Sequence, residues 1–317
     1  MTRVGTAGPN RQLWLAAAVP TAFAGFGLAW LLARPDTPPP SSLLRVVADC
    51  AGVLAVGLAC VNRLDDPRRR AELRNRARLP LIGTGAVWLL AVLGLAVGLA
   101  AESAGVGYGR LDLGTLGSYL TQISTGRLML LVAASVAVLL VSSAAARIGG
   151  TDRPLTVELV CAALALVVLP LTGHLSQRAP GAVFALAHTL SAALWCGLLA
   201  AMALTVRSRG AWARTLPRYS AVALWSVAVL VVSGVVDAAL QLDGFGALVA
   251  TGYGRILVAK TVILVGLLGA GWRFRRGWVE QAAAHRTSSA LSLRRAVAEV
   301  AVMAVVLGLA AALATVG

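Results

Sequence analysis

The sequence is poor in the residues that keep a protein soluble. Only 13% of its 317 residues are charged, and Lys260 is the one lysine beside 27 arginines. Aromatic residues are also few, at 5%. Hydrophobic residues make up 58% of the chain, and the mean hydropathy is +0.81. A water-soluble domain cannot bury that much apolar surface, so the composition excludes an ordinary soluble fold and favours a membrane protein.

Sequence motifs of catalysis are also absent. The chain has no phosphate-binding glycine loop, no H-E-x-x-H pair and no nucleophile elbow. Its four cysteines all lie in apolar segments and include no C-x-x-C pair, which excludes a zinc ribbon and a disulfide framework. We therefore expect a protein that is not an enzyme.

What the sequence has instead is a series of long apolar runs. A run of roughly 20 apolar residues crosses a lipid bilayer as a helix. We expect an all-α, polytopic membrane helical bundle of about nine transmembrane helices, the first of them uncleaved. The predicted spans are roughly 13–33, 43–61, 79–101, 127–147, 155–173, 181–206, 219–240, 255–274 and 296–315.

The distribution of arginine orients these spans. With the N-terminus placed inside, the inner segments hold 21 basic residues and the outer segments hold five. Cytoplasmic loops carry such an excess, so we expect a cytoplasmic N-terminus. The same loops account for the net charge of +15 without nucleic acid as a partner. The basic run 65–78 predicts a solvated cytoplasmic loop beside anionic lipid headgroups.

Two similar segments indicate an internal repeat. SerThrGlyArgLeu (124–128) and GlyTyrGlyArgIle (252–256) each place a Gly-Arg pair at the outer end of a span. We expect two halves, 1–154 and 155–317, each with four helices in parallel orientation. The second half carries the ninth helix.

An apolar stripe also marks the outer loop before the fourth span. Its members recur at helical spacing, and they are Leu113, Leu116, Leu120 and Ile123. This stripe predicts a short helix lying on the outer membrane surface.

Ionisable residues inside the spans share one depth. Asp49, His188, Asp237 and Lys260 each lie four to seven residues from the outer ends of their spans. At ~1.5 Å per residue, this layer is roughly 6–10 Å below the outer surface. His174 lies just above it. Each such group costs about 2.5–3.5 kcal/mol in lipid, so their alignment favours an outward-facing polar pocket. The alternative is a structural ion pair that fixes helix packing.

The residue types in this layer are those of a metal site. Imidazole with carboxylate accepts Cu(II) or Zn, whereas thiolate and thioether favour Cu(I). His174 and His188 are the candidate imidazole ligands, and Asp49 or Asp237 would balance the charge. Lys260 requires one of these carboxylates as its partner.

Softer ligands follow His188 along the same span. Trp195 is seven residues further, which puts it about 20° from His188 around a regular helix. Cys196 and Met202 continue inward, so a ladder of imidazole, thiol and thioether would carry Cu(I) toward the cytoplasm.

Seven short motifs in a fixed order resemble the membrane domain of the copper resistance protein D (CopD) family. They lie between about 155 and 315 and are ThrGlyHis (172–174), AlaHis (187–188), AlaLeuTrpCysGly (193–197), LeuProArgTyrSer (216–220), SerGly (233–234), TyrGlyArgIleLeuValAlaLys (253–260) and ArgArgAlaValAlaGlu (294–299). The first 150 residues agree with this family only in helix count and in the Gly-Arg pair.

The resemblance implies a bacterial inner-membrane protein that moves or handles copper. It also implies a periplasmic copper-binding partner, and related proteins carry a cytochrome oxidase assembly domain. The residues on family positions are His174, His188, Trp195, Tyr253, Arg255 and Lys260, where Lys260 and Arg255 would help to hold or gate the site. Cys196 and Asp237 depart from the family pattern.

The sequence predicts copper transport across, or capture at, the cytoplasmic membrane. Without an ATP-binding motif, a gradient or a partner would drive it. Two alternatives stay open at this point. Two histidines near one surface also suit the axial ligands of a haem-binding electron carrier. The other alternative is a non-transporting partner in the assembly of the cytochrome oxidase copper site.

Overall fold

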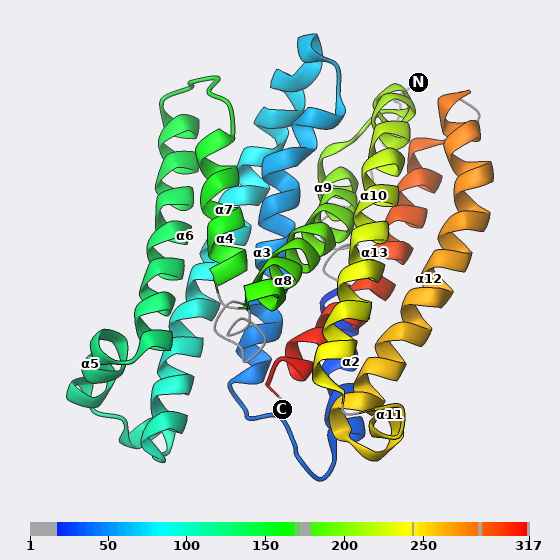
Figure 1. The fold of residues 1–317 in the computed structure, drawn as a ribbon. Helices are drawn as coiled ribbons and strands as arrows, with labels where there is room; N and C mark the ends of the chain where they lie inside the picture. The colour runs from blue at the N-terminus through cyan, green and yellow to red at the C-terminus, as the bar shows by residue number, and fades with distance from the viewer. Residues whose placement is uncertain (1–17, 169, 171–178, 243, 285–286, 316–317) are drawn as a thin grey trace, which may run out of the picture.

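A computed structural model describes residues 18–168, 170, 179–242, 244–284 and 287–315. In this part of the chain the secondary structure is helical, without strands. The helices stand side by side as an elongated bundle (Figure 1). The prediction of an all-α, multi-pass bundle is therefore confirmed.

Seven helical segments of the described chain are long and apolar enough to cross a membrane. They are α3 (Ser42–Cys60), α4 (Arg70–Ala104), α6 (Ser124–Ile148), α8 (Ala179–Ala192) with its continuation to Thr205, α10 (Arg209–Gln241), α12 (Gly252–Ala283) and α13 (Ser289–Leu313). Two shorter apolar helices, α2 (Ala18–Ala33) and α7 (Thr156–Val168), match the predicted spans 13–33 and 155–173, which both extend outside the described residues. The count of nine transmembrane helices stays a prediction.

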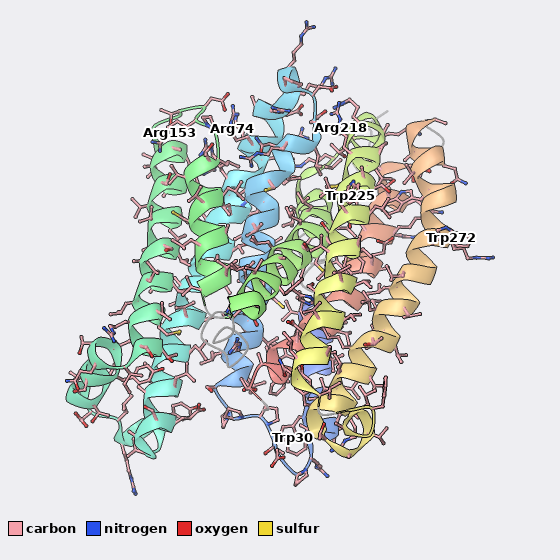
Figure 2. All side chains as sticks on the ribbon, viewed as in Figure 1. Trp30, Arg74, Arg153, Arg218, Trp225 and Trp272 are labelled. Carbon is pink, nitrogen blue, oxygen red and sulfur yellow. The ribbon has the colours of Figure 1, made fainter. Side chains whose placement is uncertain are left out.

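The ends of the bundle separate as the charge pattern predicts. Arg74, Arg153 and Arg218 come from three predicted inner segments and lie at one end, whereas Trp30 lies at the other (Figure 2). The short helices α5 (Leu113–Gln122) and α11 (Ala247–Ala250) lie at the Trp30 end (Figure 1). We call these the inner and outer ends.

The short helix predicted before the fourth span is confirmed as α5, and its place on the membrane surface stays a prediction. Asp112 caps its N-terminus, because the carboxylate accepts hydrogen bonds from the Thr115 backbone N–H at 2.9 Å and from its hydroxyl at 2.6 Å. Leu120 packs on the core, whereas Leu113 is exposed.

The two Gly-Arg segments share one local geometry. A Cβ at Gly126 would lie 2.1 Å from the carbonyl oxygen of Tyr119, and a Cβ at Gly254 would lie 2.2 Å from that of Ala247. In both places the glycine contacts a carbonyl seven residues earlier, on the short helix that precedes α6 or α12. The repeat is therefore present at these two junctions, while the division into 1–154 and 155–317 stays a prediction.

The basic run 65–78 is not the solvated loop that we expected. Residues from Arg70 onward form the start of α4, because Leu73 and Ala77 face the core. Arg78 is only 3% exposed; it donates to the Arg153 carbonyl at 2.7 Å and lies 4.0 Å from the Glu158 carboxylate. These contacts offset the cost of burying the guanidinium.

Glycine contacts bring two pairs of helices together. At the crossing of α2 with α13, a Cβ at Gly25 would lie 2.1 Å from the Val305 carbonyl oxygen. At the crossing of α3 with the segment after α8, a Cβ at Gly57 would lie 2.0 Å from the Gly197 oxygen, and one at Gly197 would lie 2.0 Å from the Val53 oxygen. Backbones approach this closely only where no side chain intervenes.

Gly197→Ala should therefore destabilise the protein. The added methyl group must push two helices apart, which costs about 1–3 kcal/mol. Thermal unfolding of detergent-purified protein should show a melting temperature several degrees lower. Gly83→Ala is the matched control, because a Cβ at Gly83 meets nothing within 4 Å; equal melting temperatures for the two variants would contradict this packing.

At the inner end, two aspartates dock the connection between α3 and α4 onto α10. Asp65 receives two hydrogen bonds from Arg214, at 2.8 and 3.2 Å, and Asp66 pairs with Arg218. Burial raises the pKa of the Asp65 carboxyl, but the hydrogen bonds and charge of Arg214 lower it more, so the net pKa lies below its usual range.

This pair predicts a pH-dependent stability. A lowered folded-state pKa stabilises the protein above the unfolded pKa of about 3.9, and that contribution is lost as the pH falls through the folded pKa. Asp65→Asn should lower the melting temperature at pH 7, and the difference from wild type should shrink below about pH 4. The exposed Asp36, replaced by Asn, is the control; a difference that stays constant with pH would refute the assignment.

Candidate functional site

His188 lies on α8 and faces α10. Its Nδ1 is 2.8 Å from the hydroxyl oxygen of Ser233. A Cβ at the next residue, Gly234, would be 3.7 Å from the ring carbon Cε1, so the imidazole packs in ordinary contact over this glycine. The small SerGly pair thus makes room for the ring and supplies its polar contact.

The hydrogen bonds of Ser233 favour one tautomer of His188. The serine hydroxyl lies 2.7 Å from the Val229 carbonyl, to which it can donate its one proton. With that donation, the serine oxygen accepts from Nδ1–H of His188 at 2.8 Å. In this tautomer Nε2 keeps its lone pair, which is the form in which a histidine binds a metal ion.

Lys260 connects this imidazole electrostatically with an aspartate of α10. Lys260 of α12 interacts electrostatically with His188 and with Asp237 of α10. Asp237 also interacts with Tyr253, and its Oδ1 is buried without a hydrogen-bond partner in the described part of the chain. Helices α8, α10 and α12 thus bring four of the predicted residues together.

Asp49, on α3, has a different partner. Its carboxylate oxygen Oδ2 lies 3.9 Å from Nε of Arg45, one turn earlier on the same helix. Of the two carboxylates predicted to pair with Lys260, the structure therefore places Asp237 beside it. A role for Asp49 as a metal ligand stays a prediction.

His174 lies outside the described residues. Among the residues that are described, no group of three or more His, Cys, Asp and Glu side chains could hold a metal ion. A site with both predicted imidazoles, His174 and His188, consequently stays a prediction.

The helix changes its winding just after His188. Residues Ala193–Gly197 form a π-helix between α8 and α9 (Leu198–Thr205). The wider turn makes the predicted 20° offset between His188 and Trp195 wrong, because that value assumes regular α-helical winding. No sequence signal marks the π-helix, although such turns are frequent at functional sites.

Tyr219 was missed as a contributor to this region. It is buried on α10, and its hydroxyl donates to the backbone carbonyl of Trp195 at 3.0 Å, within the π-helix. The hydroxyl satisfies a carbonyl in the irregular turn. The motif LeuProArgTyrSer (216–220) contained the residue but gave no sign of this role.

Arg255 acts on backbone carbonyls at the outer end. Its guanidinium donates to Leu32 at 2.8 Å, to Arg34 at 2.6 Å and to Val249 at 3.1 Å. It therefore ties the C-terminal end of α2 and the helix α11 to the start of α12. In this position it holds helices together around the site.

Two family models match the chain. Residues 37–182 match the model described as "Copper resistance protein D-like, N-terminal domain", and residues 213–313 match "Copper resistance protein D". No curated protein and no solved structure matches it. The second match lies within the region 155–315 in which the motifs carry the resemblance, whereas the first extends the family relationship to residues that those motifs did not cover. The chain is a multi-pass, copper-resistance membrane protein and belongs to the copper resistance protein D family.

Proposed function

We propose that this protein moves copper across the bacterial cytoplasmic membrane, or captures it there, with His188 as an imidazole ligand near the outer end of the bundle. The main support is the chain of hydrogen bonds from His188 through Ser233 to Val229. It orients the ring and leaves Nε2 as the ligand atom.

The charges around His188 give the other residues their roles in this proposal. Lys260 repels a cation that approaches the imidazole, and the Asp237 carboxylate offsets this charge. Asp237 also has a buried oxygen free to accept a metal or a proton. Lys260 thus tunes how strongly the pocket holds copper. Tyr253 interacts with the Asp237 carboxylate.

The second imidazole in this proposal is His174, five residues before α8 begins at Ala179. The sequence predicts that His174 lies near the outer surface, which suits a first contact with copper from outside. Since the sequence has no ATP-binding motif, an ion gradient or a partner would drive movement. A periplasmic copper-binding protein and a cytochrome oxidase assembly factor are the proposed partners.

His188→Ala and His174→Ala should each remove the copper that the imidazole site holds, and so lower the copper content of detergent-purified protein clearly below that of wild type. Each removes one of the proposed imidazole ligands. Copper is measured by mass spectrometry, beside an absorption spectrum in which a Soret band would reveal haem instead. His285→Ala is the control, since the third histidine lies in a predicted inner loop. Wild-type copper in His188→Ala would refute the site.

Ser233→Ala should weaken copper binding by about 10–100-fold without abolishing it. The variant removes the acceptor for Nδ1–H and so releases the ring from its orientation. Competition with a cuprous chelator measures the affinity. Ser226→Ala, at another buried serine of α10, controls for the loss of a hydroxyl; an equal effect of both changes would show that Ser233 acts only through helix packing.

A further inference from the structure

Two cysteines from different helices lie next to the contact between α3 and the π-helix. Cys50 of α3 and Cys196 of the π-helix interact electrostatically. Both thiols are free, both are partly buried, and both pack against the hydrophobic core. They are separated by 146 positions in the chain, so their proximity is a product of the fold.

The glycine crossing explains why these two thiols approach. Gly197 contacts the backbone of α3 at Val53 and Gly57, which fixes the position of the π-helix along α3. Cys196 is the residue before Gly197. Cys50 precedes Gly57 by seven residues, which is about two turns and places it on the same face of α3. Both cysteines therefore lie on the outer side of one rigid contact.

We propose that Cys50 and Cys196 form a cuprous-ion site with two sulfur ligands. Thiolates are soft ligands and select Cu(I), whereas imidazole with carboxylate also accepts Cu(II) and Zn. Two thiolates suffice for a two-coordinate cuprous ion, so the site needs no third His, Cys, Asp or Glu. It rests on the proposed function only in taking copper as the ion that the protein handles.

The position of the two cysteines suits a second binding site for copper. Cys196 follows His188 by eight residues on the same continuous helical segment, in the direction of the inner end. An ion that leaves the imidazole would therefore reach the thiols next on its way inward. Binding releases the two thiol protons to water and gives a complex with one net negative charge.

The test uses the full-length protein, purified in detergent under reducing, oxygen-free conditions, with cuprous ion as the probe. Maleimide labelling of each cysteine is followed by peptide mass spectrometry. Bound Cu(I) should slow the labelling of Cys50 and Cys196 by roughly tenfold or more, because a metal-bound thiolate no longer reacts. Cys60 and Cys161, also free and partly buried, are the internal controls.

The two thiols must also depend on each other. Cys50→Ser should abolish the protection of Cys196, and Cys196→Ser that of Cys50, whereas Cys161→Ser should leave both protected. Equal labelling with and without Cu(I) in the wild type, which requires no variant to fold, would overturn the proposal. Protection of one thiol that survives loss of the other would overturn it too.

His188→Ala separates this inference from the proposed function. If the imidazole site is wrong, that variant keeps all its copper, and the labelling of the two cysteines still decides the thiol site. If the thiol site is wrong, the cysteines label freely even where His188 is needed for copper.

Discussion

Lipid offers no hydrogen bonds, so the backbone polar groups of this bundle must find their partners within the protein itself. Three residues show how that requirement builds the structure. Tyr219 supplies the donor for a carbonyl of the π-helix, Ser233 connects His188 to the backbone of α10, and Arg255 takes up the carbonyls at the end of α2. Each contact joins separate helices or segments, so satisfying a polar group also fixes where the helices lie.

Small residues supply the other half of the design. Where two helices touch through glycine, the distance between them is set by backbone atoms, and no side chain can rearrange to change it. The crossing of α3 with the π-helix is such a place. It lies directly beside Trp195 and Cys196, so a close backbone contact borders the π-helix.

Hydrophobicity and charge predicted the fold well, because both act over whole spans. The run lengths predicted the long helices, the arginine excess predicted which connections share one end of the bundle, and the leucine spacing predicted α5. The electrostatic interaction of Lys260 with Asp237 was one of two options in the sequence. The choice between Asp237 and Asp49 needed the helix packing, because both carboxylates lie at a similar depth.

What failed were the inferences that assumed regular geometry. Seven residues do not return to one face when a π-turn intervenes, so Trp195 was misplaced relative to His188. The many charged residues near Arg78 in the sequence predicted that it is solvated. In the structure it is buried, where it contacts Glu158 and the Arg153 carbonyl. The first error concerns a change of winding that no sequence signal marks, and the second concerns contacts with segments far apart in the chain, which a local pattern does not reveal.

The docking of α2 has a consequence for movement within the bundle. This first described helix packs on α12 and α13, and Arg255 fastens its end to α12, although α3 and α4 follow it in the chain. Any rigid-body rocking of the α3–α4–α6–α7 group against α10, α12 and α13 would therefore carry α2 with the latter. The segment 34–41, which joins α2 to α3, would have to bend in such a motion.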